Sequence, residues 1–340
     1  MITTKDRIRR SMFYEAYRLL LREIGDYNRD ASLLAQTVFQ EKIGNESQYG
    51  EVYRGIVSAD KNAAPVCVKK VNLSLEDLQI LMLGQTLDRA IIFSCRTVWR
   101  EVFMLRLCSR LVKNKKSIHL PLHFFTAFSA NNEHNPRVSR NNPALYLYNE
   151  LADEDLKSWS AREHSTAEWL SCFLQVFFGI FVLQFYTGFI HNDLHWGNIL
   201  VHKVAPGGCW KYTIRGRDYC VPNHGHLFVL WDFGLSVLVP ELRGCGTHIR
   251  ACQDFLKILN TPKWIKKHYP GVTVPKTIID LCVLIRSFEF KNMNDLLEQH
   301  IVQACVPGSP VLESFQIGRG VAAPADQATA LPATHATLFV

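Results

Sequence analysis

The sequence lacks the features that would assign it to several common classes of protein. None of its 10 cysteines forms a Cys-x-x-Cys pair, which argues against a zinc site or a disulfide framework and favours buried free thiols in a reducing compartment. No hydrophobic run stands at the N-terminus, so we expect no secretory signal. No internal repeat is present. We therefore expect a protein of the cytoplasm or nucleus.

The sequence also has no long run of one charge. Its net charge is +7, and its densest basic cluster, Lys113, Lys115 and Lys116 with Arg110, is typical of a solvated surface. Direct nucleic-acid binding is therefore unsupported. An acidic peptide or a phosphorylated substrate is accommodated as easily.

One apolar stretch is long enough to cross a membrane. Residues Leu170 to Ile190 contain no charged residue. Gln175 and Gln184 interrupt the stretch, and it leads directly into a polar motif at His191, which favours a buried core helix over a membrane span. With 340 residues, 48% of them hydrophobic, the chain is long enough to bury a substantial core and to form two lobes or domains.

The spacing of apolar residues divides the chain into four regions. Residues 1–37 have helical spacing and predict an N-terminal helical extension. Residues 38–148 predict mainly strands, and residues 149–306 are mostly helical around a Gly-rich, basic insert at Ala205–Gly225. Residues 307–340 have the composition of a disordered tail. The elements expected in the second region are strands at Val52–Val57, Val66–Val71 and Ala144–Tyr148, a loop at Ser58–Pro65 and a helix near Arg96–Val112.

Two motifs carry the chemistry. Residues 191–200 read His-Asn-Asp-Leu-His-Trp-Gly-Asn-Ile-Leu, with Asp193 and Asn198 five residues apart. A carboxylate near an acceptor hydroxyl can take its proton, and a side-chain amide oxygen can bind Mg²⁺. Asp232 follows the strand-like run Leu227–Trp231, so that a strand delivers a second metal ligand to the edge of a cleft. Ordinary loop capping is the alternative account of Asp193 and Asn198.

Lys69 is the candidate for binding the phosphates of a nucleotide. It stands in an alternating strand, and Glu101 in the following helix is the best candidate for pairing with it and fixing its direction. Lys70 is the alternative, because a shift of one residue reverses the strand face. An exposed strand lysine is the simpler account of either residue.

A glycine-containing segment precedes Lys69. Between Ile43 and Val52 it carries Gly44 and Gly50 around polar residues, so backbone N–H groups can approach phosphate oxygens. A plain hairpin turn explains the segment equally well on its own. Its position ahead of Lys69 favours the phosphate-binding interpretation.

This ordered set of motifs resembles the eukaryotic-type protein kinase superfamily over roughly residues 38–260. The resemblance implies that Gly44 to Val52 form the glycine-rich loop, with Ile43 beside the nucleotide. It further implies the following roles: Lys69 binding phosphate, Glu101 pairing with it, Asp193 as catalytic base, Asn198 and Asp232 as Mg²⁺ ligands, Tyr148 near the gatekeeper position, Glu150 and Leu151 in the adenine-binding hinge, and Asp155 near the ribose.

The chain departs from that family at informative positions. Glu46 replaces the middle glycine, and Asn192 replaces the Arg that receives a phosphorylated activation loop, so we expect no switch of that kind. His195 replaces the usual Lys of serine/threonine kinases, and Asp-Leu-His-x-Gly-Asn is also typical of aminoglycoside and choline kinases. No Ala-Pro-Glu motif follows Asp232, and Asp254 is expected to brace the catalytic loop. The reduced lower lobe is similar to that of compact serine/threonine kinases of large DNA viruses.

Taken together, the sequence predicts an α+β protein with a bilobal protein-kinase-like fold, a small β-rich N-lobe and a larger helical C-lobe. The predicted activity is transfer of the γ-phosphate of ATP, with Mg²⁺, to Ser or Thr hydroxyls of a protein substrate, with Asp193, Lys69, Asn198 and His195 as the catalytic set. Two alternatives remain open: a small-molecule phosphotransferase and a pseudokinase scaffold. If the protein is viral, its location is the host cell.

Overall fold

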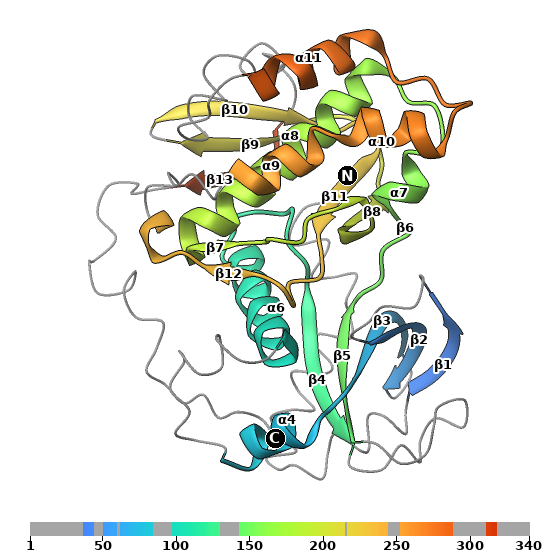
Figure 1. The fold of residues 1–340 in the computed structure, drawn as a ribbon, viewed down its shortest axis with the longest axis vertical. Coiled ribbons are helices and arrows are strands. Elements are labelled where there is room, and N and C mark those ends of the chain that lie inside the picture. Colours follow the sequence, from blue (N-terminus) through green and yellow to red (C-terminus); the bar gives the residue numbers. More distant parts are fainter. Residues whose placement is uncertain are drawn as a thin grey trace. The chain divides into compact units, whose positions relative to one another are not determined.

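The computed structural model describes residues 37–43, 50–59, 62–83, 97–129, 143–214, 216–243, 252–287 and 311–317. The chain divides into two compact units. The β-rich unit contains the described residues up to Arg106 together with Leu122–Leu151, and the helical unit contains Leu107–Pro121 and the described residues from Ala152 onward. The protein is thus a mixed α+β structure with its first sheet in the N-terminal part (Figure 1). Residues 1–36 of the predicted N-terminal helical extension lie outside the described residues, and Thr37 begins a strand.

A five-stranded antiparallel sheet forms the β-rich unit, with strand order β1-β2-β3-β5-β4. The phenyl ring of Phe39 on β1 lies 5.6 Å from the ring of Tyr53 and 6.0 Å from that of Tyr146 on β5. Since β2 and β3 separate these two strands, the sheet must curl to bring the rings together. The strands are β1 (Thr37–Lys42), β2 (Glu51–Ala59), β3 (Asn62–Asn72), β4 (His123–Ser129) and β5 (Ala144–Glu150).

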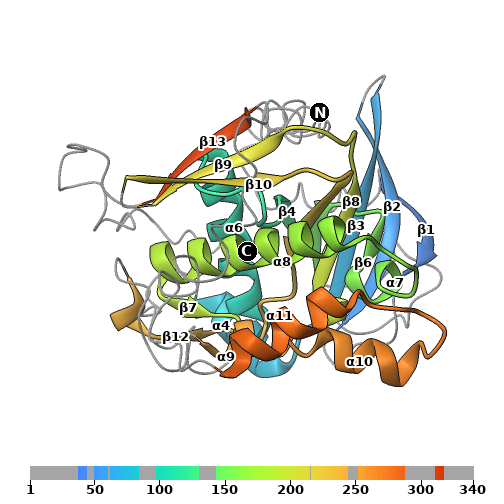
Figure 2. The ribbon, with the colours of Figure 1, turned by 90° about the horizontal axis from the view of Figure 1, so that it is seen from above.

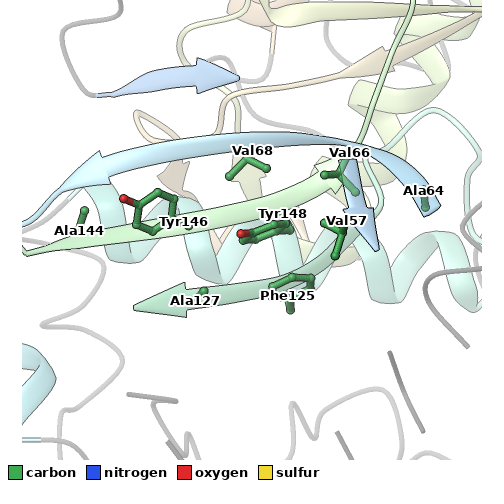
Figure 3. Close-up of a cluster of buried hydrophobic side chains, with 9 residues drawn as sticks. All are labelled: Val57, Ala64, Val66, Val68, Phe125, Ala127, Ala144, Tyr146 and Tyr148. Atoms are coloured by element: carbon green, nitrogen blue, oxygen red, sulfur yellow. The ribbon is translucent and has the colours of Figure 1, made fainter. Parts of the chain in front are cut away.

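The curled sheet encloses an apolar core on one face. Alternate residues of each strand point to this face, as the two-residue repeat of a strand requires. Tyr148 is stacked on Phe125 with ring centroids 4.1 Å apart, and its hydroxyl is 2.9 Å from the Thr37 hydroxyl. The buried cluster consists of Val57, Ala64, Val66, Val68, Phe125, Ala127, Ala144, Tyr146 and Tyr148 (Figure 3).

The predicted loop at Ser58–Pro65 is wrong for most of its length. β2 continues to Ala59 and β3 begins at Asn62, and the two residues pair across the turn. Most of the segment predicted as a loop is therefore paired strand. The other strand predictions in this region are confirmed, with β3 and β5 each longer than expected.

Two of the described helices lie between β3 and β4 in the sequence. α4 spans Leu75–Leu83, and α6 spans Thr97–Lys113, which confirms the helix predicted near 96–112. The apolar stripe of α6 includes Val98, Val102 and Leu105, all nearly fully buried. α6 begins in the β-rich unit and ends in the helical unit.

The central helix of the helical unit is α8 (Thr166–Thr187). Ser165 and Glu168 form a reciprocal capping box at its start, and Gly188, with φ of 73°, ends it. Among the described helices, α8 alone has the length and apolar composition to cross a membrane, yet 83% of its most apolar window is buried inside the structure. This burial is that of a core helix, as the two interrupting glutamines predicted.

Short strands and helices surround α8. β8 pairs with both β6 and β11, β7 pairs with β12, and α9 and α11 pack against α8 (Figures 1 and 2). The strands are β6 (Glu154–Asp155), β7 (Phe189–Ile190), β8 (Ile199–Lys203), β11 (His226–Leu230) and β12 (Val237–Leu238). The helices are α7 (Leu156–Trp159), η3 (Trp196–Asn198), η4 (Pro240–Leu242), α9 (Cys252–Ile258), α10 (Thr261–His268) and α11 (Lys276–Ser287).

The Gly-rich insert forms a hairpin, and a strand at residues 311–317 pairs with it. β9 (Cys209–Ile214) pairs antiparallel with β10 (Arg217–Pro222), and β13 (Val311–Ile317) adds in parallel to β9. Residues 311–317 were predicted to lie in a disordered tail, so that prediction is wrong for them. Phe315 and Ile317 are buried, and Phe315 stacks on Tyr212, which gives this short segment an apolar anchor.

Candidate active site

The hairpin of β8 and β11 places Asn198 and Asp232 at one end of the helical unit. Leu230 pairs with Ile199, and the backbone N–H of Trp231 donates to the Asn198 carbonyl at 2.8 Å. Asn198 therefore stands at the first residue before β8, and Asp232 stands two residues after β11, at the same end of the hairpin. The two side chains that the sequence predicted as metal ligands come from adjacent strand ends.

Asp254 holds the loop that carries Asp193. Its two carboxylate oxygens accept hydrogen bonds from the backbone N–H groups of His191 at 2.7 Å and Asn192 at 2.9 Å. The predicted bracing contact of Asp254 is confirmed. Burial raises the pKa of Asp254 above its ordinary value, and these hydrogen bonds oppose that rise. The His191 ring also bonds the carbonyl of Trp231 at 2.7 Å, which joins the loop to the end of β11.

Asn192 makes a second set of contacts on the same loop. Its φ of 66° is in the left-handed region, which Asn tolerates better than most residues. Its side-chain amide donates to the carbonyl of Leu235 at 3.1 Å, and its own carbonyl accepts from Lys257 Nζ at 2.6 Å. Asn192 thus joins the loop to the segment that follows Asp232.

Two side chains of the loop lie close to Asp193: Asn198 bonds its backbone carbonyl, and His195 lies near its carboxylate. The Asn198 amide nitrogen donates to the Asp193 carbonyl at 2.9 Å, which leaves its oxygen as the acceptor side of the group. The N–H of Gly197 donates to His195 Nδ1 at 3.1 Å, so a neutral His195 carries its proton on Nε2. That Nε2 lies 3.9 Å from Asp193 Oδ2. Asp193 is half-buried and His195 is exposed, while Asn198 is buried.

In the β-rich unit, Lys69 and Glu101 form a buried ion pair. Lys69 Nζ lies 2.7 Å and 2.8 Å from the two carboxylate oxygens of Glu101, and the two side chains are 2% and 3% exposed. The contact predicted from the sequence is therefore present. A charge pair this buried is maintained only where geometry is favourable, because removing two charges from water is costly.

Lys70 points to the other face of the sheet. Its Nζ lies 4.0 Å from Glu51 Oε2, and burial lowers its pKa. Glu51 also accepts hydrogen bonds from Lys42 Nζ at 3.1 Å and from the Tyr53 hydroxyl at 3.0 Å. Burial alone would raise the pKa of Glu51, but the bonds from Lys42 and Tyr53 outweigh it and hold that pKa below its ordinary value. Lys70 thus belongs to a separate network at the base of the β1–β2 hairpin.

The glycine-containing segment is described only at its two ends. The N–H of Ile43 donates to the Val52 carbonyl at 2.8 Å, which joins the two ends of the segment. Gly44 lies outside the described residues. Gly50 is placed so tightly that a Cβ on it would meet the carbonyl oxygen of Lys70 at 2.5 Å. A glycine is therefore required here for the close approach of β2 to β3.

Tyr148, the residue expected near a gatekeeper position, lies on the opposite face of the sheet from Lys69. Tyr148 pairs with Val68 across the β3–β5 ladder, so both point into the enclosed core. Lys69 follows Val68 and points to the opposite face. Leu147, which pairs with Lys69, is the β5 residue beside it. Tyr148 and Lys69 therefore lie on opposite faces of the sheet, and the gatekeeper assignment remains a prediction.

The predicted hinge and ribose residues have structural contacts of their own. The N–H of Glu150 donates to the Leu122 carbonyl at 3.0 Å at the end of β5, and Leu151 follows as the last residue of the β-rich unit. Asp155 caps α7, because its carboxylate accepts from the N–H of Ser158 at 2.7 Å. Nucleotide binding by these residues remains a prediction.

The donor set in the helical unit suits Mg²⁺ better than a transition metal. Within the described residues, no group of three or more His, Cys, Asp and Glu side chains is assembled to hold a metal ion. Mg²⁺ needs no such cage, because it is usually held by one or two carboxylate or amide oxygens together with water and substrate phosphates. The free oxygen of Asn198 and the carboxylate of Asp232 have this chemistry. The six cysteines whose side chains are described form no disulfide.

Some residues that position the site were not found from the sequence. Lys257 bonds the loop that carries Asp193, and its spacing of three residues from Asp254 on one helix was a signal that could have identified it. Glu51 was identifiable from its position opposite Lys42 at the base of a hairpin. The contact of Trp196 with Thr261, 65 residues away, had no local signal.

Comparison with known proteins relates short segments of the chain to protein kinases. No family model matches the chain. It is 40% identical over 79 residues to "Putative serine/threonine-protein kinase 019R" of Frog virus 3 (isolate Goorha), covering 23% of this chain and 9% of that protein. It is 31% identical over 94 residues to serine/threonine-protein kinase haspin of Mus musculus, covering 28% of this chain and 12% of haspin. "Uncharacterized protein 011L" of Invertebrate iridescent virus 3 is 33% identical over 64 residues, covering 19% and 8%.

These similarities support a relationship with protein kinases, including a kinase of a virus. The matched segments span only between 8% and 12% of the relatives' own lengths.

Proposed function

We propose that the protein is an ATP- and Mg²⁺-dependent kinase that transfers the γ-phosphate to Ser or Thr hydroxyls of a protein. The observation that carries this proposal is the loop around Asp193, held by Asp254 and aligned with Asn198 and Asp232 at one end of a strand hairpin. Similarity to kinases supports the same activity. The β-rich unit is proposed as the small N-lobe of a kinase-like bilobal fold, and the helical unit as its C-lobe.

Each residue has a distinct role in the proposed reaction. Asp193 accepts the proton of the acceptor hydroxyl as that oxygen attacks the γ-phosphorus and the bond to the β-phosphate oxygen breaks. Asn198 and Asp232 would hold Mg²⁺, which would neutralise charge on the phosphates when bound. Lys69, oriented by Glu101, binds the phosphates as a fixed cation. His195 Nε2–H, close to Asp193, offers a donor to the transferred phosphoryl group.

The nucleotide-binding residues are proposed from the glycine segment and the C-terminal end of β5. We assign phosphate and base binding to Gly44 and Gly50, with Ile43 and Val52. Glu150, Leu151 and Asp155 are assigned to adenine and ribose. A cytoplasmic or nuclear location, in a host cell if the protein is viral, remains part of the proposal.

Transfer to a small molecule is the second candidate function, favoured by His195 in the position where protein kinases carry Lys. The test measures transfer of labelled γ-phosphate to casein-like protein, aminoglycosides and choline. We expect label on protein only, lost in both Asp193→Ala and Lys69→Ala. Label on the small molecules alone would select the second candidate. Equal signal from the native chain and both variants would remove the catalytic assignment and leave a pseudokinase scaffold.

A further inference from the structure

A basic surface lies on α10, the helix that contacts the loop carrying Asp193. α10 exposes Lys263, Lys266 and Lys267, which are spaced by three and four residues and so share one face of the helix. We call these three residues the α10 lysine surface. The sequence from Phe255 to Ile279 contains no Asp or Glu, so no acidic residue near in sequence offsets them.

Helix stability does not account for this surface. Cations in the last turn are favourable because they oppose the helix dipole, which explains Lys266 and Lys267. Lys263 lies in the first turns, where a positive charge is unfavourable. Like charges spaced by three or four residues also repel one another. Within the described part of the chain, none of the three has a carboxylate at ion-pair distance. An acidic ligand would offset both the unfavourable charge of Lys263 near the start of the helix and the repulsion among the three lysines.

Two contacts fix α10 to the proposed catalytic loop. The indole N–H of Trp196 donates to the Thr261 hydroxyl at 2.7 Å, at the first residue of α10. The rings of Trp196 and Trp264 stack with centroids 4.4 Å apart, and His268 stacks on Trp264 at 4.7 Å. Trp196 is three residues from Asp193, so the helix and the proposed base are held by one short segment of chain.

We propose that the α10 lysine surface binds an acidic segment of the protein substrate, next to the Ser or Thr that receives phosphate. This rests on the proposed kinase function. An eight-residue helix is about 12 Å long, which matches about four residues of an extended peptide. A peptide is favoured over nucleic acid or an anionic membrane because the helix that carries the surface is fixed to the loop that the acceptor hydroxyl must reach. The enzyme therefore selects acceptors flanked by Asp, Glu or phosphorylated residues.

The test compares peptides with one Ser acceptor flanked by Glu, by Gln or by Lys. We expect the native protein to have a kcat/KM about tenfold higher for the Glu peptide than for the Gln peptide, through KM. The triple variant Lys263→Gln, Lys266→Gln, Lys267→Gln loses this preference and keeps the native rate on the Gln peptide. The matched control Lys113→Gln, Lys115→Gln, Lys116→Gln removes the same charge elsewhere and keeps the preference.

Anisotropy of a fluorescent Glu peptide separates this proposal from the kinase assignment, because it needs no turnover. Binding to the native protein that the α10 triple variant loses, without phosphorylation of any peptide, supports the docking surface and overturns the kinase function. Phosphorylation that is equal for all three peptides overturns the docking surface and leaves the kinase function intact. A single-stranded oligonucleotide or phosphatidylserine vesicles that bind more tightly than the Glu peptide, through the same lysines, also overturn it.

Discussion

The two units hold their candidate residues in different ways. In the β-rich unit, one buried ion pair joins Lys69 on β3 to Glu101 on α6, and the direction of Lys69 depends on it. In the helical unit, the loop around Asp193 is held by backbone hydrogen bonds to Asp254, by Lys257, by the Asn192 side chain and by the β8–β11 ladder. The first arrangement centres on one buried ion pair, and the second is distributed over several hydrogen bonds.

This difference sets how each part should respond to mutation. A concentrated charge pair fails all at once when one partner is removed, because the remaining charge stays buried. A distributed network of hydrogen bonds loses only the part that is removed, and the cost is that of the unsatisfied groups. Stability and activity should therefore fall together in the β-rich unit and separate more readily in the helical unit.

The largest effect is expected from Glu101→Gln. This change removes the carboxylate that neutralises the buried Lys69, and breaking a buried pair costs about 3–5 kcal/mol in free energy of unfolding. Urea denaturation followed by circular dichroism measures the loss. As a control, the double variant Lys69→Met, Glu101→Leu should regain most of the stability and remain inactive in phosphate transfer. A Glu101→Gln protein as stable as the native one would show that the pair is not the concentrated contact we describe.

A smaller loss is expected from Asp254→Ala. The buried N–H of His191 would lose its acceptor, at about 1–3 kcal/mol in free energy of unfolding, whereas the part-buried N–H of Asn192 can turn to water. Displacement of the loop should lower phosphate transfer on the order of a hundredfold. Asp254→Asn keeps one side-chain oxygen as acceptor and should be intermediate in both urea denaturation and initial rate. Native transfer in Asp254→Ala would contradict the bracing role.

A modest effect is expected from Glu51→Gln at the base of the glycine hairpin. The change keeps the shape and removes the charge that Lys42 and Lys70 share, so the hairpin should be held less firmly and KM for ATP should rise about fivefold, within the range of a partly exposed pair. The control is Glu41→Gln, because Glu41 pairs with Arg54 and both are exposed. Steady-state kinetics that show an equal KM in both variants would remove the hairpin role.

The smallest effect concerns His226, at the opposite end of β11 from Asp232. Burial lowers its pKa, the charges of His164 and Arg162 act in the same direction, and Glu168 and Glu154 oppose them. Because its folded pKa lies below the unfolded value of about 6.5, the unfolded chain binds more protons as the pH falls through that value. Stability should therefore fall between pH 7.5 and 5.5.

Urea denaturation at the two pH values tests this. The fall should be smaller in His226→Gln and unchanged in the exposed control His224→Gln. At pH 7.5 phosphate transfer should be native in both variants, since the network around Asp193 does not include this end of the strand. A loss of transfer in His226→Gln alone would show that the loop around Asp193 depends on contacts at the far end of β11, contrary to the network we describe.

Local patterns predicted most of the described elements. An apolar stripe predicted α6, a long uncharged apolar stretch predicted α8, and short strand-like runs predicted β3, β5 and β11, because each pattern reports how much of an element is buried. Asp193, Asn198 and Asp232 were identified because their spacing and the following strand are local. The pairing of Lys69 with Glu101 was also predicted, from a strand lysine and a helix glutamate in sequence order.

Features that depend on distant partners were not predicted. Composition suggested disorder at residues 311–317, yet pairing with β9, about 100 residues earlier, makes them a strand. The face of Tyr148 could not be read from its motif, since only the register with β3 decides it. The stacking of Trp196 on Trp264 joins two segments whose sequences give no sign of each other.

The central claim is that Asp193 accepts the proton during phosphate transfer. Its most direct test is to measure, on one preparation of Asp193→Asn, both Mg²⁺-dependent ATP binding by calorimetry and the initial rate of γ-phosphate transfer to a Ser peptide. We predict ATP binding within about twofold of native and a rate lowered on the order of 10²–10⁴-fold, the usual contribution of a general base. Native transfer by Asp193→Asn would contradict the account.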